Sequence, residues 1–176
     1  MAHRAGIEVA GYVTTDDDPE VLTRALEDAT KLHRPDAIVT SGGISAGKYE
    51  VIRQVLTGWF GHVDQQPGGP QGIASFHGTP VICLPGNPIS TMVSFRLFVA
   101  PTLGWAPAAY RVPIAHAIEG LPHKDQFRRG YAGAQARVTG GASSHLLAQA
   151  VDTTHLIRIP AGKSLSAGEE VKVYPL

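Results

Sequence analysis

One junction limits the possible folds of this chain more than any other segment: Val81 to Leu84 leads directly into Pro85-Gly86-Asn87-Pro88. The four apolar residues predict a short buried strand, and the residues that follow have the composition of a turn. Asn87 is suited to cap a helix and Pro88 to occupy its first turn, so we expect a nearly all-apolar helix from there to about Leu103. A strand, a tight turn and a capped helix in this order are typical of α/β proteins.

The first hundred residues show the same alternation of strands and helices. The helix after Asp16-Asp17-Asp18-Pro19 has apolar residues at helical spacing and one buried stripe. His77-Gly78 is expected to form a hairpin-like corner. Together these elements predict a three-layer α/β domain with a mostly parallel sheet over residues 1–104. The other expected strands are Ile7 to Val13, Ala37 to Thr40 and Ile73 to Phe76, and the other expected helices are Val21 to Leu32 and about Tyr49 to Leu56.

The sequence changes character after the segment from Gly104 to Ala109, which is rich in Pro and Ala and has no strand or helix pattern. We place a domain boundary there. Residues 105–176 contain short, roughly alternating segments separated by Gly or Pro, which suit a small all-β barrel or a sandwich. These segments are Arg111 to Ile118, Gln126 to Val138, His155 to Ile159 and Glu170 to Tyr174.

Composition excludes several classes of function. The chain has 15 Lys and Arg against 15 Asp and Glu, so no overall charge attracts nucleic acid or an anionic membrane. No apolar run approaches the roughly twenty residues that span a bilayer. Cys83 is the single cysteine and lies in an apolar run, so it is expected to be a small buried residue in a cytoplasmic protein. The eight histidines have no zinc-ligand spacing.

Two strand-to-helix loops are candidates for a binding site. Ser41-Gly42-Gly43-Ile44-Ser45 follows one expected strand, and Pro85-Gly86-Asn87-Pro88 follows another. In an open parallel sheet such loops meet outside the carboxyl ends of the strands. Paired glycines allow backbone N–H groups to approach an anion closely, and a helix start offers free N–H groups. Each loop alone also fits an ordinary α/β connection, but the two in this order favour an anion site.

The motifs in their order resemble the substrate-binding half of the molybdopterin molybdenumtransferases, the MoeA and gephyrin E-domain family. They are Ser-Gly-Gly-Ile-Ser-Ala-Gly before Tyr49, then Pro67-Gly68-Gly69-Pro70, then Leu-Pro-Gly-Asn-Pro-Ile-Ser, and the likeness extends over essentially the whole chain. The resemblance implies a molybdopterin-binding α/β domain followed by a C-terminal β-barrel. It also implies that adenylylated molybdopterin and molybdate are the substrates, that AMP is released with help from Mg²⁺, and that the family works as a homodimer.

The resemblance also implies roles for single residues. The pterin-phosphate pocket would be lined by Ser41, Gly42, Gly43 and Ser45, with Pro85 and Pro88 shaping the adjacent wall and Gly86 and Asn87 presenting backbone. Asp17 matches an active-site carboxylate and would hold the cation through oxygen, although the three aspartates before Pro19 also suit the capping of a helix. Arg129 and Ser144 match polar residues that reach across to the cleft, whereas Arg128 is expected on a solvated face.

The chain departs from the family pattern in three ways. Lys48 stands where many relatives carry an acidic residue, and His62, Gln66 and Gly69 stand where they commonly carry lysines. We expect that the two N-terminal domains, the Thr-Gly-Asp-Glu-Leu strand and the first helix of the family are missing. The enzyme's activity is therefore left open. The alternatives are a fragment or part of a competent transferase, and a non-catalytic molybdopterin-binding or scaffold module. The related adenylyltransferase is disfavoured by Asn87-Pro88 and by the expected barrel.

Overall fold

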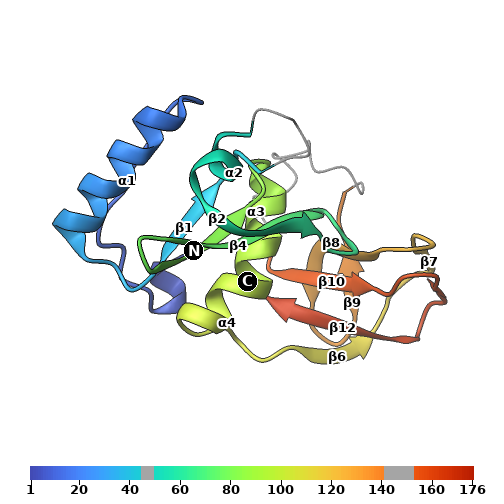
Figure 1. Cartoon of the computed structure of the whole chain (residues 1–176). Coiled ribbons are helices and arrows are strands. Elements are labelled where there is room, and N and C mark those ends of the chain that lie inside the picture. The colour runs from blue at the N-terminus through green and yellow to red at the C-terminus, as the bar shows by residue number, and fades with distance from the viewer. Residues whose placement is uncertain (45–49, 141–152) are drawn as a thin grey trace.

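The computed structural model describes residues 1–44, 50–140 and 153–176 (Figure 1). Its helical elements are η1 (His3–Ala5), α1 (Pro19–His33), α2 (Val51–Val55), α3 (Pro88–Ser94), η2 (Phe95–Val99) and α4 (Ala100–Leu103). Its strands are β1 (Ile38–Ser41), β2 (Thr57–His62), β3 (Gln65–Gln66), β4 (Pro70–Phe76), β5 (Thr79–Leu84), β6 (Tyr110–Pro113), β7 (Ile118–Glu119), β8 (Asp125–Ala132), β9 (Ala136–Val138), β10 (His155–Ile159), β11 (Ser164–Leu165) and β12 (Glu170–Pro175). No helix of these described ranges is long and apolar enough to cross a membrane.

The first sheet has the order β1-β5-β4-β2 and is mixed. Strand β1 runs parallel to β5, whereas β5 is antiparallel to β4 and β4 to β2. The prediction of a mostly parallel sheet is therefore wrong. The reason lies in the two-residue corner between β4 and β5: His77 and Gly78 have φ of 48° and 88°, and a tight turn of this kind reverses the chain into an antiparallel hairpin.

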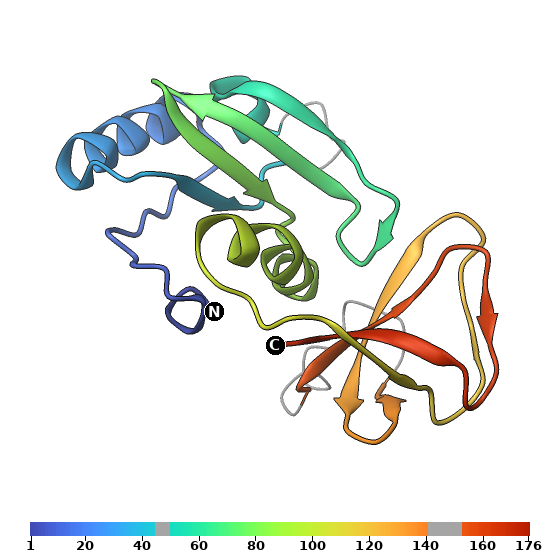
Figure 2. The same cartoon turned by 90° about the horizontal axis from the view of Figure 1, so that it is seen from below.

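Helices cover both faces of this sheet, which gives three layers (Figure 2). On one face, Leu22 and Leu26 of α1 and Val51 of α2 are buried against Val81 and Cys83 of β5. On the opposite face lies the continuous helical segment from Pro88 to Leu103. Its middle turn is widened, because Ala100 donates to the carbonyl of Phe95 five residues back, just before Pro101, which has no N–H to continue the regular pattern.

In the first half, the predicted strand over residues 7–13 is absent, and strands β2 and β3 were not predicted. Residues 7–13 form no ladder with any described strand, and Gly11 there lies against the ring of His33 at the end of α1. Strand β2 was not predicted, because Gly58 and Gly61 interrupt its apolar pattern. The other expected elements are present within a few residues of their predicted bounds, and α2 is shorter than expected.

The second sheet has the order β3-β8-β10-β12-β6, with β9 paired to β8. Its pairs are antiparallel, except that β3 runs parallel to β8. Ile114, Ile157, Ile159 and Val173 are fully buried in its core. Across the described residues no ladder closes this sheet, and a single bridge between Ile114 and Ala136 joins its two ends. The barrel thus stays a prediction.

The two sheets are joined in two places. Strand β3 comes from the first half of the sequence but pairs with β8, through Gln65 opposite Asp125 and Gln66 opposite Gln126. The helical segment provides the second joint, because Val93 packs with Phe127 and Leu156. The long helix therefore lies between the first sheet and the second (Figure 2).

Candidate functional site

The two glycine loops meet at one edge of the first sheet, as predicted. Strands β1 and β5 are parallel neighbours, so Ser41 at the end of one lies opposite Leu84 at the end of the other. The Gly42 N–H donates to the carbonyl of Leu84 across 3.0 Å. A Cβ atom on Gly86 would lie 3.1 Å from the Cα of Gly42, so only glycine fits this approach without a shift. Gly42 and Gly43 have φ of 98° and 67°, conformations that favour glycine.

Hydroxyl groups link the loops further. The Oγ atom of Ser41 lies 3.3 Å from Oγ1 of Thr91 and 3.4 Å from the carbonyl oxygen of Pro85. Thr91 Oγ1 is also 2.5 Å from the carbonyl oxygen of Pro85 and 3.0 Å from that of Asn87. Sequence reasoning missed Thr91. Its signal was available, since a threonine four residues after a helix cap can bond back to the cap carbonyl.

Asn87 caps α3 as predicted, and this changes what the helix start offers. Its Oδ1 accepts from the N–H groups of Ile89 and Ser90, both at 3.1 Å, and the Thr91 N–H donates to the Asn87 carbonyl. Pro88 has no N–H. The free N–H groups expected at this helix start are therefore already bonded within the chain. An anion at this edge would depend instead on the Ser41 hydroxyl, on the glycine backbone and on the general field of the helix.

The third motif, Pro67-Gly68-Gly69-Pro70, docks on the same helix. Gly68 has φ of 92°, and a Cβ there would lie 2.9 Å from Oγ of Ser94. Gln71 is buried and fixes this contact by donating to the Gly68 carbonyl at 2.7 Å and lying 2.5 Å from Ser94 Oγ. Gln66 accepts from Gln126 Nε2 at 2.8 Å, so its side chain belongs to the joint between the sheets.

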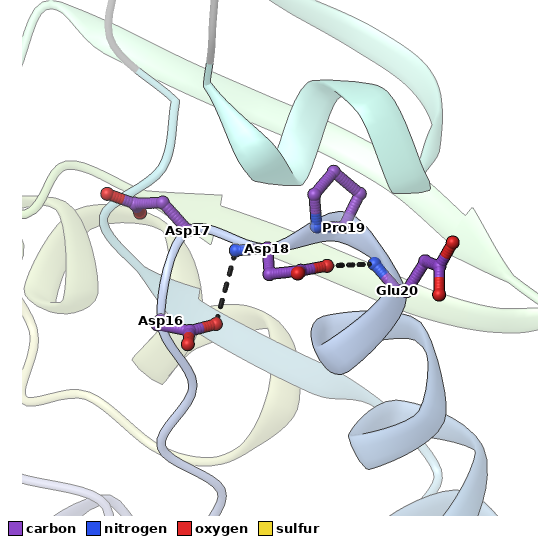
Figure 3. Close-up of a pocket in the computed structure, with 5 residues that line it drawn as sticks. All are labelled: Asp16, Asp17, Asp18, Pro19 and Glu20. Carbon is purple, nitrogen blue, oxygen red and sulfur yellow. Dashed lines mark hydrogen bonds between the residues drawn. The ribbon is translucent and has the colours of Figure 1, made fainter.

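Asp16, Asp17 and Asp18 have three different roles at the start of α1 (Figure 3). Asp18 is the cap, with Oδ1 accepting from Glu20 N at 2.8 Å and from Val21 N at 3.3 Å. Asp16 accepts from the Asp18 N–H at 3.2 Å. The Asp17 carboxylate points away from both and faces an open surface hollow that Asp16 to Glu20 line. Asp17 is thus outside the cap. No cluster of three or more His, Cys, Asp or Glu side chains able to hold a metal occurs in the described ranges.

The two arginines of β8 lie on opposite faces of the second sheet. Arg129 is opposite Leu156 and two residues after Phe127, both of which pack on Val93, so it is on the face turned toward α3. It is only 4% exposed, and burial lowers the pKa of its guanidinium. Arg128 is opposite Ile157 on the core side and is half-buried, with its pKa lowered by burial. The expected solvated face for Arg128 is wrong. Ser45, Lys48 and Ser144 lie outside the described residues.

Two family models match the chain: "Probable molybdopterin binding domain" over residues 1–105 and "MoeA C-terminal region (domain IV)" over residues 111–176. Among curated relatives, molybdopterin molybdenumtransferase 2 of Mycobacterium tuberculosis is 34% identical, over 98% of this chain and 47% of that protein. The molybdopterin molybdenumtransferase of a Nostoc species is 27% identical, over 100% of this chain and 45% of its own length. The chain thus spans about half the length of these relatives.

A solved structure agrees with these matches. The molybdopterin biosynthesis MoeA protein from Pyrococcus horikosii superimposes with a TM-score of 0.70 and 28% identity, over 90% of this chain and 41% of that one.

Proposed function

The chain belongs to the MoeA family of molybdopterin molybdenumtransferases, and on that premise we propose that it is the substrate-binding part of the step that inserts molybdate into adenylylated molybdopterin with release of AMP. The observation that carries this proposal is the meeting of the Ser41 and Pro85 loops at the carboxyl ends of two parallel strands. In α/β sheets, ligands bind at the loops that follow neighbouring parallel strands, as these two loops do.

In this proposal the chain's main contribution is positioning of an anionic pterin. The left-handed backbone of Gly42 and Gly43 and the close approach of Gly86 to Gly42 set the shape of the two loops, and the Ser41 hydroxyl donates to a phosphate oxygen. Pro85 and Pro88 stiffen the wall of the pocket, and Asn87 holds the turn in shape through its cap. Ser45 and Ser144 are included on the resemblance alone. Arg129 supplies positive charge from the face of the second sheet that is turned toward α3.

The residues present fit a magnesium ion in one respect. Asp17 has a carboxylate that takes no part in capping α1, and Mg²⁺ prefers oxygen ligands, commonly one or two carboxylates together with substrate phosphates. Asp17 would then hold the cation by one oxygen, with the other ligands coming from the substrate and water. The ion would neutralise phosphate charge, which favours departure of AMP.

The wider organisation is proposed on the same resemblance. Residues 1–104 and 105–176 would be two domains, the second closing as a small barrel, in a cytoplasmic homodimer. The bridge between Ile114 and Ala136 supports a closed second sheet, because it brings the two ends of the open path together.

A non-catalytic molybdopterin-binding or scaffold module is the second candidate. It is favoured by the use of the first-turn N–H groups of α3 within the chain, which leaves the pocket fewer donors for an anion. Both candidates predict ligand binding and differ only in whether AMP is released.

Equilibrium dialysis of the chain with molybdopterin under anaerobic conditions tests the proposal, with bound pterin quantified by fluorescence after oxidation. We expect saturable binding that Gly42→Val abolishes, because a β-branched residue at φ of 98° strains the loop and its side chain would lie against Gly86 of the other loop. If circular dichroism shows that the chain is folded and it still binds no pterin, both candidate functions are contradicted. Chromatographic detection of AMP after addition of adenylylated molybdopterin, molybdate and Mg²⁺ separates the enzyme from the binding module.

A further inference from the structure

The contacts of Thr91 indicate which hydroxyl group of the proposed pocket donates to which acceptor. A hydroxyl has one proton and donates to one acceptor at a time. The shortest contact of Thr91 Oγ1 is the 2.5 Å to the Pro85 carbonyl oxygen, compared with 3.0 Å to the Asn87 carbonyl oxygen and 3.3 Å to Ser41 Oγ. Thr91 therefore donates to Pro85, and its lone pairs remain for Ser41.

Ser41 is held much more loosely. It is exposed at the end of β1, and both contacts of its hydroxyl, 3.3 Å to Thr91 and 3.4 Å to the Pro85 carbonyl, are near the limit for a hydrogen bond. Turning this hydroxyl toward a ligand therefore costs little. The neighbouring Gly42 N–H is already bonded to Leu84, so the Ser41 proton is a donor that remains available at this edge.

We propose that Thr91 is a positioning residue that keeps the Ser41 hydroxyl available to a phosphate-bearing ligand by satisfying the Pro85 carbonyl. Without the Thr91 hydroxyl, this carbonyl is a buried acceptor in need of a donor, and Ser41 Oγ is already 3.4 Å away. Ser41 would then donate to Pro85 and compete with the ligand. The inference rests on the proposed function, in which the Ser41 loop binds the pterin phosphate, and adds to it a residue that controls one donor.

A double-mutant cycle on molybdopterin binding tests this role, using Ser41→Ala, Thr91→Val and the double variant. Loss of a hydrogen bond to a charged group predicts a Kd increase of about tenfold for Ser41→Ala, and we expect about three- to tenfold for Thr91→Val. Because Thr91 acts through Ser41, the double variant should bind no more weakly than Ser41→Ala alone. Thr91→Ser keeps the hydroxyl and should restore the wild-type Kd.

Thr23 offers a matched control. It lies in the second turn of α1, outside both loops, and its Oγ1 donates to the Pro19 carbonyl four residues back at 2.7 Å. Thr23→Val removes the same kind of bond and should leave the Kd unchanged. Thr91→Ala also removes the hydroxyl but leaves a smaller side chain than Thr91→Val does. It should raise the Kd by the same factor if the lost hydroxyl, and not altered packing of the methyl groups, is the cause.

The outcomes separate this inference from the proposed function. Absence of pterin binding by the wild-type chain overturns both. If the wild type binds pterin, two results overturn the role of Thr91 and leave the proposed function standing. One is an unchanged Kd in Thr91→Val, and the other is that the effects of Ser41→Ala and Thr91→Val add in the double variant. Non-additive effects with rescue by Thr91→Ser support the inference.

Discussion

Gly86 and Gly42 face each other across the two loops so closely that a Cβ on Gly86 would lie 3.1 Å from the Gly42 Cα. Gly86→Ala should therefore push the loops apart, lowering the free energy of unfolding by about 1–3 kcal/mol, as overpacking does elsewhere. Molybdopterin binding should weaken at least about tenfold, because a small displacement spoils two or more contacts at once. Urea denaturation and equilibrium dialysis measure the two effects.

Gly133 provides the control for this substitution. A Cβ there would meet nothing within 4 Å, and its φ is not in the left-handed region. Gly133→Ala should leave both quantities unchanged. If Gly86→Ala behaved like Gly133→Ala, the close approach of the loops would have no energetic importance.

Asp17 and Asp18 should differ in their effect on stability. Asp18→Ala removes the side chain that accepts from Glu20 N and Val21 N, and loss of such a cap costs about 1 kcal/mol. Asp17→Ala removes a carboxylate outside the cap and should leave the urea midpoint unchanged. Equal losses in the two variants would mean that Asp17 helps to form the start of α1 and would remove the reason for assigning it to a cation.

Arg96 should be a major determinant of the joint between helix and second sheet. It is 7% exposed, with Nε 2.6 Å from the Pro175 carbonyl oxygen and Nη2 2.5 Å from that of Pro107. Hydrogen bonds to a charged group are each worth about 1.5–3 kcal/mol, so Arg96→Ala should lower the free energy of unfolding by about 3 kcal/mol or more. The lysine side chain of Arg96→Lys has a single nitrogen, so this variant should retain only part of the stability that Arg96→Ala loses.

Denaturation curves again give the measurement, and Arg24 gives the control. Arg24 pairs with Glu20 on the exposed surface of α1, so Arg24→Ala should produce no measurable change. An Arg96→Ala variant as stable as Arg24→Ala would show that the two carbonyl contacts contribute nothing.

Cys83 should be unreactive in the folded chain and should make stability depend on alkaline pH. It is fully buried, and burial raises the pKa of its thiol. Above about pH 8.5, the ordinary value, the unfolded chain loses this proton while the folded chain keeps it. The folded state then binds more protons, so stability falls as pH rises.

Comparison with Cys83→Ala isolates this effect, since the other titrating groups are common to both proteins. The stability difference between the wild type and Cys83→Ala should shrink between pH 8 and pH 10, and a thiol reagent should label the wild type only in urea. Rapid labelling without urea would contradict the buried position of Cys83.

The sequence predicted the structure best where a residue pattern is compatible with a single local conformation. Asn87 followed by Pro88 correctly predicted a capped helix, and the two glycine loops that follow expected strands correctly predicted a meeting at the carboxyl ends of β1 and β5. The relative directions of the strands were harder to predict from the sequence. His77-Gly78 was recognised as a corner, yet the antiparallel consequence for β4 and β5 was not drawn. Residues 7–13 have the pattern of a strand, but a strand also needs an edge to pair with, and pairing is not encoded locally.

The candidate site was predictable in outline only. The residue types at both loops gave its place in the sheet, but hydrogen-bond partners depend on atoms that are distant in sequence. Ser41 and Thr91 are fifty positions apart and meet only because β1 and β5 are neighbours. Likewise, the capping of α1 by Asp18 rather than Asp17 depends on one backbone turn, which three successive aspartates do not specify.

Strand β3 has a consequence for how the chain unfolds. Because Gln65 and Gln66 extend the second sheet from within the first half of the sequence, cutting the chain near residue 104 would take an edge strand away from the part that follows. The cut would also expose the apolar side of Val93, which Phe127 and Leu156 now cover. Each part therefore depends on the other for some of its buried surface, and thermal melting is expected as one cooperative transition rather than two separate ones.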